Sequence, residues 1–287
     1  MNAEGEKQPG ACSDDMVLAV LQAALQRDRL ALHYQPQVRL DDGVVTGFEA
    51  LLRCSDPEHG FVSPARFIPL AEASGLIHTL GQWVLRRACA DAVRLRGAYG
   101  RDVRVAVNVS PLQLEPGNLP QLFAAELAAV RLDPQALELE LTESLPLPAG
   151  PEARQQLARI RASGVSLALD DFGVAYANLN SLLDLDVDTL KIAGVFVCAP
   201  DDNPRAAAVL RAIMLLAAQL NLAVVAECAE TESHLQRLRA ACAGLPLSHK
   251  ISVQGFCFSR PLDCDSLCRD AGNLSAHWRD GAFRQTR

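Results

Sequence analysis

The chain has 287 residues, enough for one large domain or two small ones, and 49% of them are hydrophobic, which suffices for a sizeable core. Its formal net charge of −7 argues against a general nucleic-acid surface, because binding to a phosphate backbone needs an excess of basic residues. An anionic substrate would therefore need a metal ion, or local Arg and Lys residues, to balance its charge.

The start of the chain does not resemble a targeting segment. Residues 1–12 are expected to form a loose polar tail, and the apolar stretch Met16 to Leu25 lacks a basic leader and a small-residue cleavage pattern. No apolar run is long enough for a membrane span. The nine cysteines are odd in number, irregularly spaced and without a C-x-x-C pair, so we expect free thiols in a cytoplasmic protein.

A β-hairpin is predicted after a first helix. Apolar residues at helical spacing predict that helix over about 13–28. Two extended runs follow at 31–38 and 44–52, and the turn signal Asp41-Asp42-Gly43 lies between them. The two runs should therefore pair as antiparallel strands.

Helices and strands alternate through the rest of the chain. Helices are expected at about 63–75, 81–96, 118–130, 150–162, 179–183, 204–220 and 230–241, and strands at about 103–109, 136–141, 165–171, 189–192, 222–226 and 252–258. Eight strands in about 250 residues favour an α/β fold, a closed (β/α)₈ TIM-like barrel with one antiparallel strand from the hairpin. The barrel should span 13–272, with a polar tail over 273–287. An open doubly wound sheet is the alternative.

Polar residues gather toward the C-terminal ends of the predicted strands. They are Glu49, Asn108, Glu140, Asp170, Asp171, Lys191, Glu227 and Gln254. Each alone has a simpler structural explanation, such as a turn residue, a cap or an exposed strand position. In a barrel, however, these ends converge on one face, where active sites lie. The five carboxylates would repel one another unless neutralised, and oxygen-rich clusters suit Mg²⁺ or Mn²⁺. Two such ions that share a carboxylate such as Asp170 would suit phosphoester hydrolysis.

These residues occur within a series of motifs that resembles the EAL domain, the bacterial cyclic di-GMP phosphodiesterase domain. The resemblance covers about residues 14–265. It rests on Tyr34-Gln35-Pro36, Glu49-Ala50-Leu51, 67–72, 107–110, 140–144, 169–173, 190–192, 225–227 with 230–231, and Gln254-Gly255, all in family order.

The resemblance implies a role for each residue. It implies that two Mg²⁺ or Mn²⁺ ions are held by Glu49, Asn108, Glu140, Asp170, Asp171 and Glu227, of which Glu49 and Glu227 act in catalysis together with Lys191. Lys191 would orient the attacking water, and Gln254 would support the water network and the substrate. Arg53 would contact a substrate phosphate, and Gln35 would lie near the guanine or the phosphate. Glu143 and Glu230 would be supporting acids. The reaction would open cyclic di-GMP to linear pGpG.

The chain departs from the family pattern around this set. Val174, Ala175 and Ala177 change the loop after Asp171, Ala193 replaces an Asp, Cys228 replaces a Gly, and Cys54 replaces a common Trp. The alternative function is therefore a weak or inactive EAL domain that acts as a cyclic di-GMP receptor or a protein-interaction regulator. The resemblance also implies a homodimer through the loop and helix after Asp171. Neither a nucleic-acid polymer nor a membrane is expected as a partner.

Overall fold

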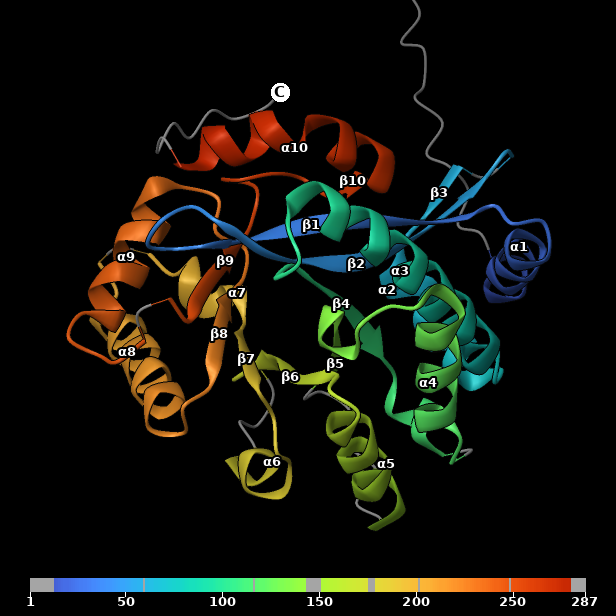
Figure 1. Ribbon diagram of the computed structural model, residues 1–287, viewed down its shortest axis with the longest axis horizontal. Coiled ribbons are helices and arrows are strands. Elements are labelled where there is room, and N and C mark those ends of the chain that lie inside the picture. Colours follow the sequence, from blue (N-terminus) through green and yellow to red (C-terminus); the bar gives the residue numbers. More distant parts are fainter. Residues whose placement is uncertain are drawn as a thin grey trace, which may run out of the picture.

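The computed structural model describes residues 13–58, 60–115, 117–142, 151–174, 179–200, 202–247 and 249–279, with the backbone alone described at 179–181 and 273–279. Eight strands form a closed barrel (Figure 1). They are β1 (Leu30–Arg39), β2 (Val45–Asp56), β4 (Arg104–Val109), β5 (Leu137–Thr142), β6 (Ser166–Phe172), β7 (Thr189–Ile192), β8 (Ala223–Ala226) and β9 (Ile251–Gln254).

The antiparallel strand expected from the hairpin is β1. It runs antiparallel to β2 on one side and to β9 on the other, whereas every other neighbouring pair in the ring is parallel. Because β1 pairs with both, it closes the sheet on itself. The predicted (β/α)₈ TIM-like barrel is confirmed, and the open doubly wound sheet is excluded.

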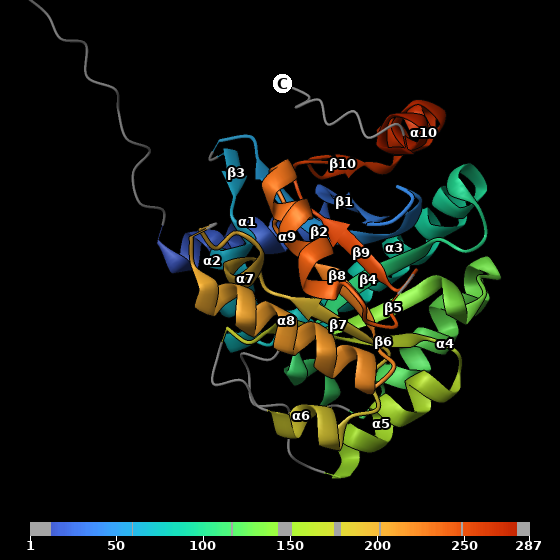
Figure 2. The same ribbon diagram turned by 90° about the vertical axis from the view of Figure 1, so that its left-hand side faces the viewer.

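Helices surround the ring of strands (Figures 1 and 2). They are α1 (Asp14–Gln26), α2 (Pro64–Ala73), α3 (Ile77–Tyr99), α4 (Leu119–Val130), α5 (Pro151–Ala162), α6 (Leu179–Asp184), α7 (Gly194–Val197), α8 (Pro204–Gln219), α9 (Glu232–Cys242) and α10 (Cys264–Arg279). Helix α10 extends past residue 273, so the segment expected as a polar tail begins inside a helix. No helix in the described part of the chain is both long and apolar enough to cross a membrane.

Two short strands and one strand end were not foreseen. Strand β3 (Gly60–Val62) pairs with the far end of β2, and β10 (Leu262–Asp263) pairs with β1. The strand expected over 252–258 ends at Gln254, because the chain turns there against Ala229. A Cβ on Gly255 would lie 1.9 Å from the carbonyl oxygen of Ala229, so this close approach needs a glycine.

Strand β5 shows how the barrel is filled. Its alternating Leu and Glu residues fit a strand with one solvent-facing side. In the structure Leu137, Leu139 and Leu141 belong to the main hydrophobic core, and Glu138 and Glu140 are buried as well. The two glutamates therefore lie on the other face of the strand, inside a polar barrel interior. The candidate site lies in this polar interior.

Candidate metal centre

Lys191 on β7 lies at the centre of a cluster of carboxylates. Its Nζ atom is 2.9 Å from Glu140 Oε2, 3.0 Å from Asp170 Oδ1 and 2.9 Å from Glu227 Oε1, and it is 3.7 Å from Glu49 Oε2. The side chain of Lys191 is fully buried. A buried ammonium is tolerated only when opposite charges surround it, so Lys191 is a counterion here and not a surface lysine.

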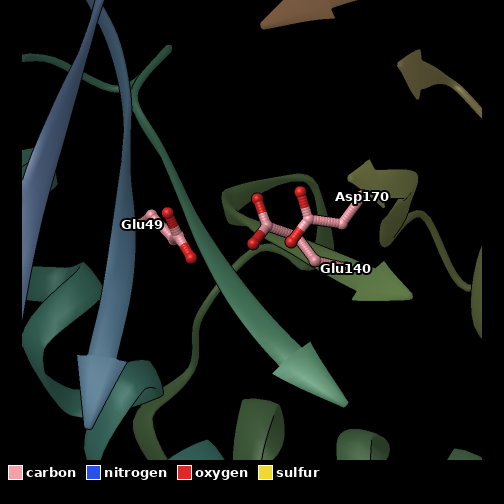
Figure 3. Close-up of side chains that lie close together, drawn as sticks. All are labelled: Glu49, Glu140 and Asp170. Carbon is pink, nitrogen blue, oxygen red and sulfur yellow. The ribbon is translucent and has the colours of Figure 1, made fainter. Parts of the chain in front are cut away.

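Glu49 is held in place by two amide groups. Asn108 Nδ2 on β4 donates to Glu49 Oε1 at 2.8 Å, and Gln254 Nε2 at the end of β9 donates to Glu49 Oε2. Figure 3 shows Glu140 and Asp170 side by side, with Glu49 facing them from β2. Residues toward the C-terminal ends of β4, β5, β6 and β9 thus meet Glu49, which lies within β2, as expected for a barrel.

A β-bulge orients the two adjacent aspartates. Successive strand residues normally point to opposite faces. Between β6 and β7 the register shifts after Leu169, so that Phe172 pairs with Ile192. Asp171 adopts a φ of 55°, and its backbone N–H donates to Asp170 Oδ1 at 2.9 Å. Bulges re-aim side chains in this way. As a result, oxygens of Asp170, Asp171 and Glu227 lie within 4.8 Å of one another.

The pKa values reflect burial and crowding of like charges. Burial raises the pKa of Glu140 well above its usual value, despite the attraction of Lys191, and Glu49 and Asp170 add to the rise. Burial also raises the pKa of Glu227, to about 7, with Lys191 opposing the rise. For Glu49, burial is outweighed by Lys191 and by the hydrogen bonds from Gln254 and Asn108, so its pKa is lowered. Burial by itself would lower the pKa of Lys191, but the carboxylates raise it well above its usual value.

These features fit a site for hard divalent cations. Both carboxylate oxygens of Glu140 are buried without a hydrogen-bond donor of suitable geometry. Oxygens of Glu49, Glu140 and Asp170 lie within 4.8 Å of one another, so Asp170 belongs to both three-carboxylate groups. All these donors are oxygen atoms, which Mg²⁺ and Mn²⁺ prefer. A cation would add the positive charge that a single lysine does not fully supply.

A cavity of about 250 Å³ opens beside the cluster. It is lined by Gln35, Glu49, Leu51, Glu227, Cys228, Glu230, Gln254, Gly255 and Phe256. Gln35 and Gln254 are therefore at the cavity, as is Glu230, which is exposed and whose backbone N–H donates to His234 Nδ1 at 3.2 Å. Arg53 lies two residues beyond Leu51 on the same face of β2 and is half-buried, with Nη1 donating to the carbonyl oxygen of Leu52.

The departures from the family pattern differ in their surroundings. Cys228 adopts the left-handed conformation, with a φ of 57°, at the rim of the cavity. Ala193 is buried and precedes α7 as an N-cap residue without a side-chain hydrogen bond. Cys54 is buried in a second hydrophobic cluster with residues of α1 and α2. Glu143 and residues 175–178 lie outside the described residues.

Sequence reasoning missed Gln37. This buried residue of β1 donates through Nε2 to Gln254 Oε1 at 3.2 Å. The available signal was its spacing, because Gln35 and Gln37 share one face of the strand.

Comparison with known proteins gives a consistent result. A family model described as "EAL domain" matches residues 19–261. The bifunctional diguanylate cyclase/cyclic di-GMP phosphodiesterase MucR of Pseudomonas aeruginosa is 37% identical over 269 residues, which cover 93% of this chain and 37% of MucR. The cyclic di-GMP phosphodiesterase NbdA of the same organism is 40% identical over 247 residues, 86% of this chain and 31% of NbdA. The chain thus spans about a third of the length of these curated relatives.

Solved structures agree with this result. The PaMucR phosphodiesterase in its c-di-GMP complex matches with a TM-score of 0.78 and 38% identity, over 88% of this chain and 99% of that one. The EAL domain of Mycobacterium smegmatis DcpA matches with a TM-score of 0.69 and 33% identity, over 85% of this chain and 98% of that one.

Proposed function

The chain belongs to the EAL domain family, and from this premise we propose that it hydrolyses cyclic di-GMP to linear pGpG with two divalent metal ions. The observation that carries the proposal is the cluster of buried carboxylates around Lys191, at the end of the barrel where active sites lie. The cavity beside the cluster supports it, as do the relatives whose names state this activity.

The proposed ligands of the two ions are Glu49, Asn108, Glu140, Asp170, Asp171 and Glu227. When bound, Mg²⁺ or Mn²⁺ would neutralise the phosphodiester and lower the pKa of a water molecule at the site. Asp170 is suited to lie between the two ions, because it belongs to both carboxylate groups. Asn108 contributes in a second way, because its donation to Glu49 Oε1 fixes the direction of that carboxylate.

Lys191 has a separate role in the proposal. Its Nζ atom lies within 3.0 Å of oxygens of Glu140, Asp170 and Glu227. An ammonium group can only donate hydrogen bonds, so a water molecule held among these residues would accept one from Nζ. The ammonium would orient that water for attack at phosphorus. Because Lys191 is fully buried, its orientation is fixed before substrate arrives.

Substrate would enter along the face of β2 that carries Glu49, Leu51 and Arg53. We assign Arg53 to a phosphate of cyclic di-GMP, since its guanidinium is the kind of planar donor that binds phosphate. Gln35 and Gln254 would contact the substrate from the cavity wall. Glu230 and Glu143 are proposed as acids that support the loops around the site.

The proposal includes a cytosolic location and a homodimer. The described cysteines are all free, which suits the cytosol. Two exposed apolar residues, Val174 after β6 and Leu183 on α6, are 57% and 83% exposed and would be covered in a dimer. Light scattering should give a dimer mass for the parent and a monomer mass for Leu183→Asp.

The experiment that tests the proposed activity is incubation with cyclic di-GMP and Mn²⁺, followed by chromatography for pGpG. We expect pGpG from the parent, and none in excess chelator or from Glu140→Gln. Binding of cyclic di-GMP should be measured on the same samples. Binding of cyclic di-GMP without release of any pGpG would contradict the proposed phosphodiesterase activity and would favour the receptor function.

A further inference from the structure

Three glutamines inside the barrel form a hydrogen-bonded chain that ends at Glu49. Gln37 Nε2 donates to Gln254 Oε1 at 3.2 Å. Gln254 Nε2 donates both to Glu49 Oε2 and to Gln35 Oε1, the latter at 3.2 Å. Gln35 Nε2 in turn donates to the backbone carbonyl of Ser259 at 3.2 Å. All three glutamines are buried.

The chemistry of the two ends fixes the direction of every bond in this chain. An ionised carboxylate and a backbone carbonyl can only accept hydrogen bonds. The group that Gln254 presents to Glu49 must therefore be its NH₂, and this leaves the carbonyl oxygen of Gln254 facing Gln37. Gln37 must then present its own NH₂. If Gln254 were flipped, its carbonyl oxygen would face the Glu49 carboxylate, and two acceptors would be in contact.

Gly47 provides the space that Gln37 needs. Gln37 lies opposite Gly47 of β2 on one side and opposite Gln254 of β9 on the other. A Cβ at position 47 would lie 2.8 Å from Gln37 Oε1 and 3.2 Å from the carbonyl oxygen of Arg104. Both are closer than ordinary contacts, so a larger residue would displace the Gln37 side chain.

We propose that Gln37, which lies opposite Gly47, is a positioning residue. It fixes the orientation of the Gln254 carboxamide so that the NH₂ group of Gln254 donates to Glu49. This inference rests on the proposed function, because Glu49 is there a metal ligand. Gln37 acts through Gln254, to which it donates, and does not line the cavity beside the cluster. Groups that orient a ligand typically change metal affinity by about 10–100-fold when removed.

The test compares the parent with Gln37→Met, which keeps the length of the side chain but cannot donate. Mn²⁺ affinity is measured from free Mn²⁺ by electron paramagnetic resonance, and the Gln254 side-chain NH₂ signals are followed by ¹⁵N NMR in metal-free protein. We expect Gln37→Met to weaken Mn²⁺ binding about 10-fold and to shift or broaden those signals. The matched control is Gln156→Met, the same change at another buried glutamine, which donates to Leu114 O on the outside of the barrel.

A double-mutant cycle separates positioning from packing. In a Gln254→Met background, Gln37→Met should cause no further loss of Mn²⁺ affinity, because the group it orients is gone. Independent, additive losses would overturn the proposal, as would unchanged Gln254 signals in Gln37→Met. If the parent neither binds Mn²⁺ nor hydrolyses cyclic di-GMP, the proposed function fails instead, and the NMR comparison still decides what Gln37 does.

Discussion

Lys191 and Glu140 form an ion pair that is closed to solvent. Lys191 Nζ lies 2.9 Å from Glu140 Oε2, and neither side chain has exposed surface. Removing one partner of a buried ion pair leaves an uncompensated charge in a medium that solvates it poorly. Here Asp170, Glu227 and Glu49 also depend on the same ammonium.

Replacing Lys191 by Met should therefore destabilise the metal-free protein. We expect a loss of about 3–5 kcal/mol in the free energy of unfolding, measured by urea denaturation in chelator. Added Mn²⁺ should then raise the melting temperature of Lys191→Met by more than that of the parent. Lys250→Met, at a lysine that bonds to Asn221 near the surface, is the control and should change stability by less than about 0.5 kcal/mol. A similar small loss for Lys191→Met would mean that the carboxylates do not need this counterion.

Substitution of Asp170 should reduce Mn²⁺ binding and pGpG release more than substitution of any residue that only supports a metal ligand. It lies in both carboxylate groups, so Asp170→Asn should weaken Mn²⁺ binding and slow pGpG release by more than the about 10–100-fold expected for a residue that only orients a ligand. Asp263→Asn, at an aspartate that accepts from the Ser266 backbone, is the matched control and should leave both quantities unchanged. Equal effects of the two substitutions would show that Asp170 is not a ligand at the proposed metal site.

The choice of metal gives a further prediction. Mg²⁺ or Mn²⁺ should support pGpG release, whereas Ca²⁺ should support it poorly, because Ca²⁺ takes more ligands at longer and more variable distances. Rates measured with each ion after removal of metal by chelation would show this. Equal rates with Ca²⁺ and Mn²⁺ would contradict it.

The fold could be predicted from the sequence because its signals are local. The turn signal Asp41-Asp42-Gly43 predicted the hairpin, and the alternation of helices with apolar strands favoured a barrel. The strand expected over 252–258 ended early because Gly255 packs against Ala229, which is far away in the sequence. Such a tertiary contact leaves no local pattern beyond the glycine itself.

The candidate site was foreseen as a set of residues but not as an arrangement. Strand ends predicted that Glu49, Glu140, Asp170 and Glu227 would converge. The β-bulge at Asp170 and Asp171 was not visible, because the period of two predicts opposite faces for adjacent residues. Gln37 was missed for a related reason, since its role depends on pairing with strands that begin and end elsewhere in the chain.

Cys228→Gly should stabilise the protein slightly. Cys228 has a φ of 57°, a conformation that costs a residue with a Cβ about 1–2 kcal/mol and glycine much less. Part of that gain is offset by the greater freedom of glycine in the unfolded chain, so we expect about 0.5–1 kcal/mol from urea denaturation. A clear loss of stability would show that the contact of Cys228 with Gly194 outweighs the backbone strain.

The thiols should differ in reactivity in the native state. Cys198 and Cys228 are exposed, whereas Cys89 and Cys257 are buried. Burial raises the pKa of Cys89 and Cys257 to about 12 and that of Cys228 to about 11, so access to the reagent is the main difference between the two pairs. Iodoacetamide at pH 8 should therefore modify the exposed pair first, as read by peptide mass spectrometry. All nine cysteines should react once the protein is denatured without reductant. Protected cysteines under those conditions would indicate disulfides.

The most direct test of the metal-dependent phosphodiesterase site is a Mn²⁺ titration in which bound ions per chain and pGpG release are measured on the same samples. The account predicts two bound Mn²⁺ ions per chain, and pGpG release that begins as the sites fill and stops in excess chelator. Release that is unchanged in excess chelator would contradict the account, as would a chain that binds two Mn²⁺ ions and cyclic di-GMP but releases no pGpG.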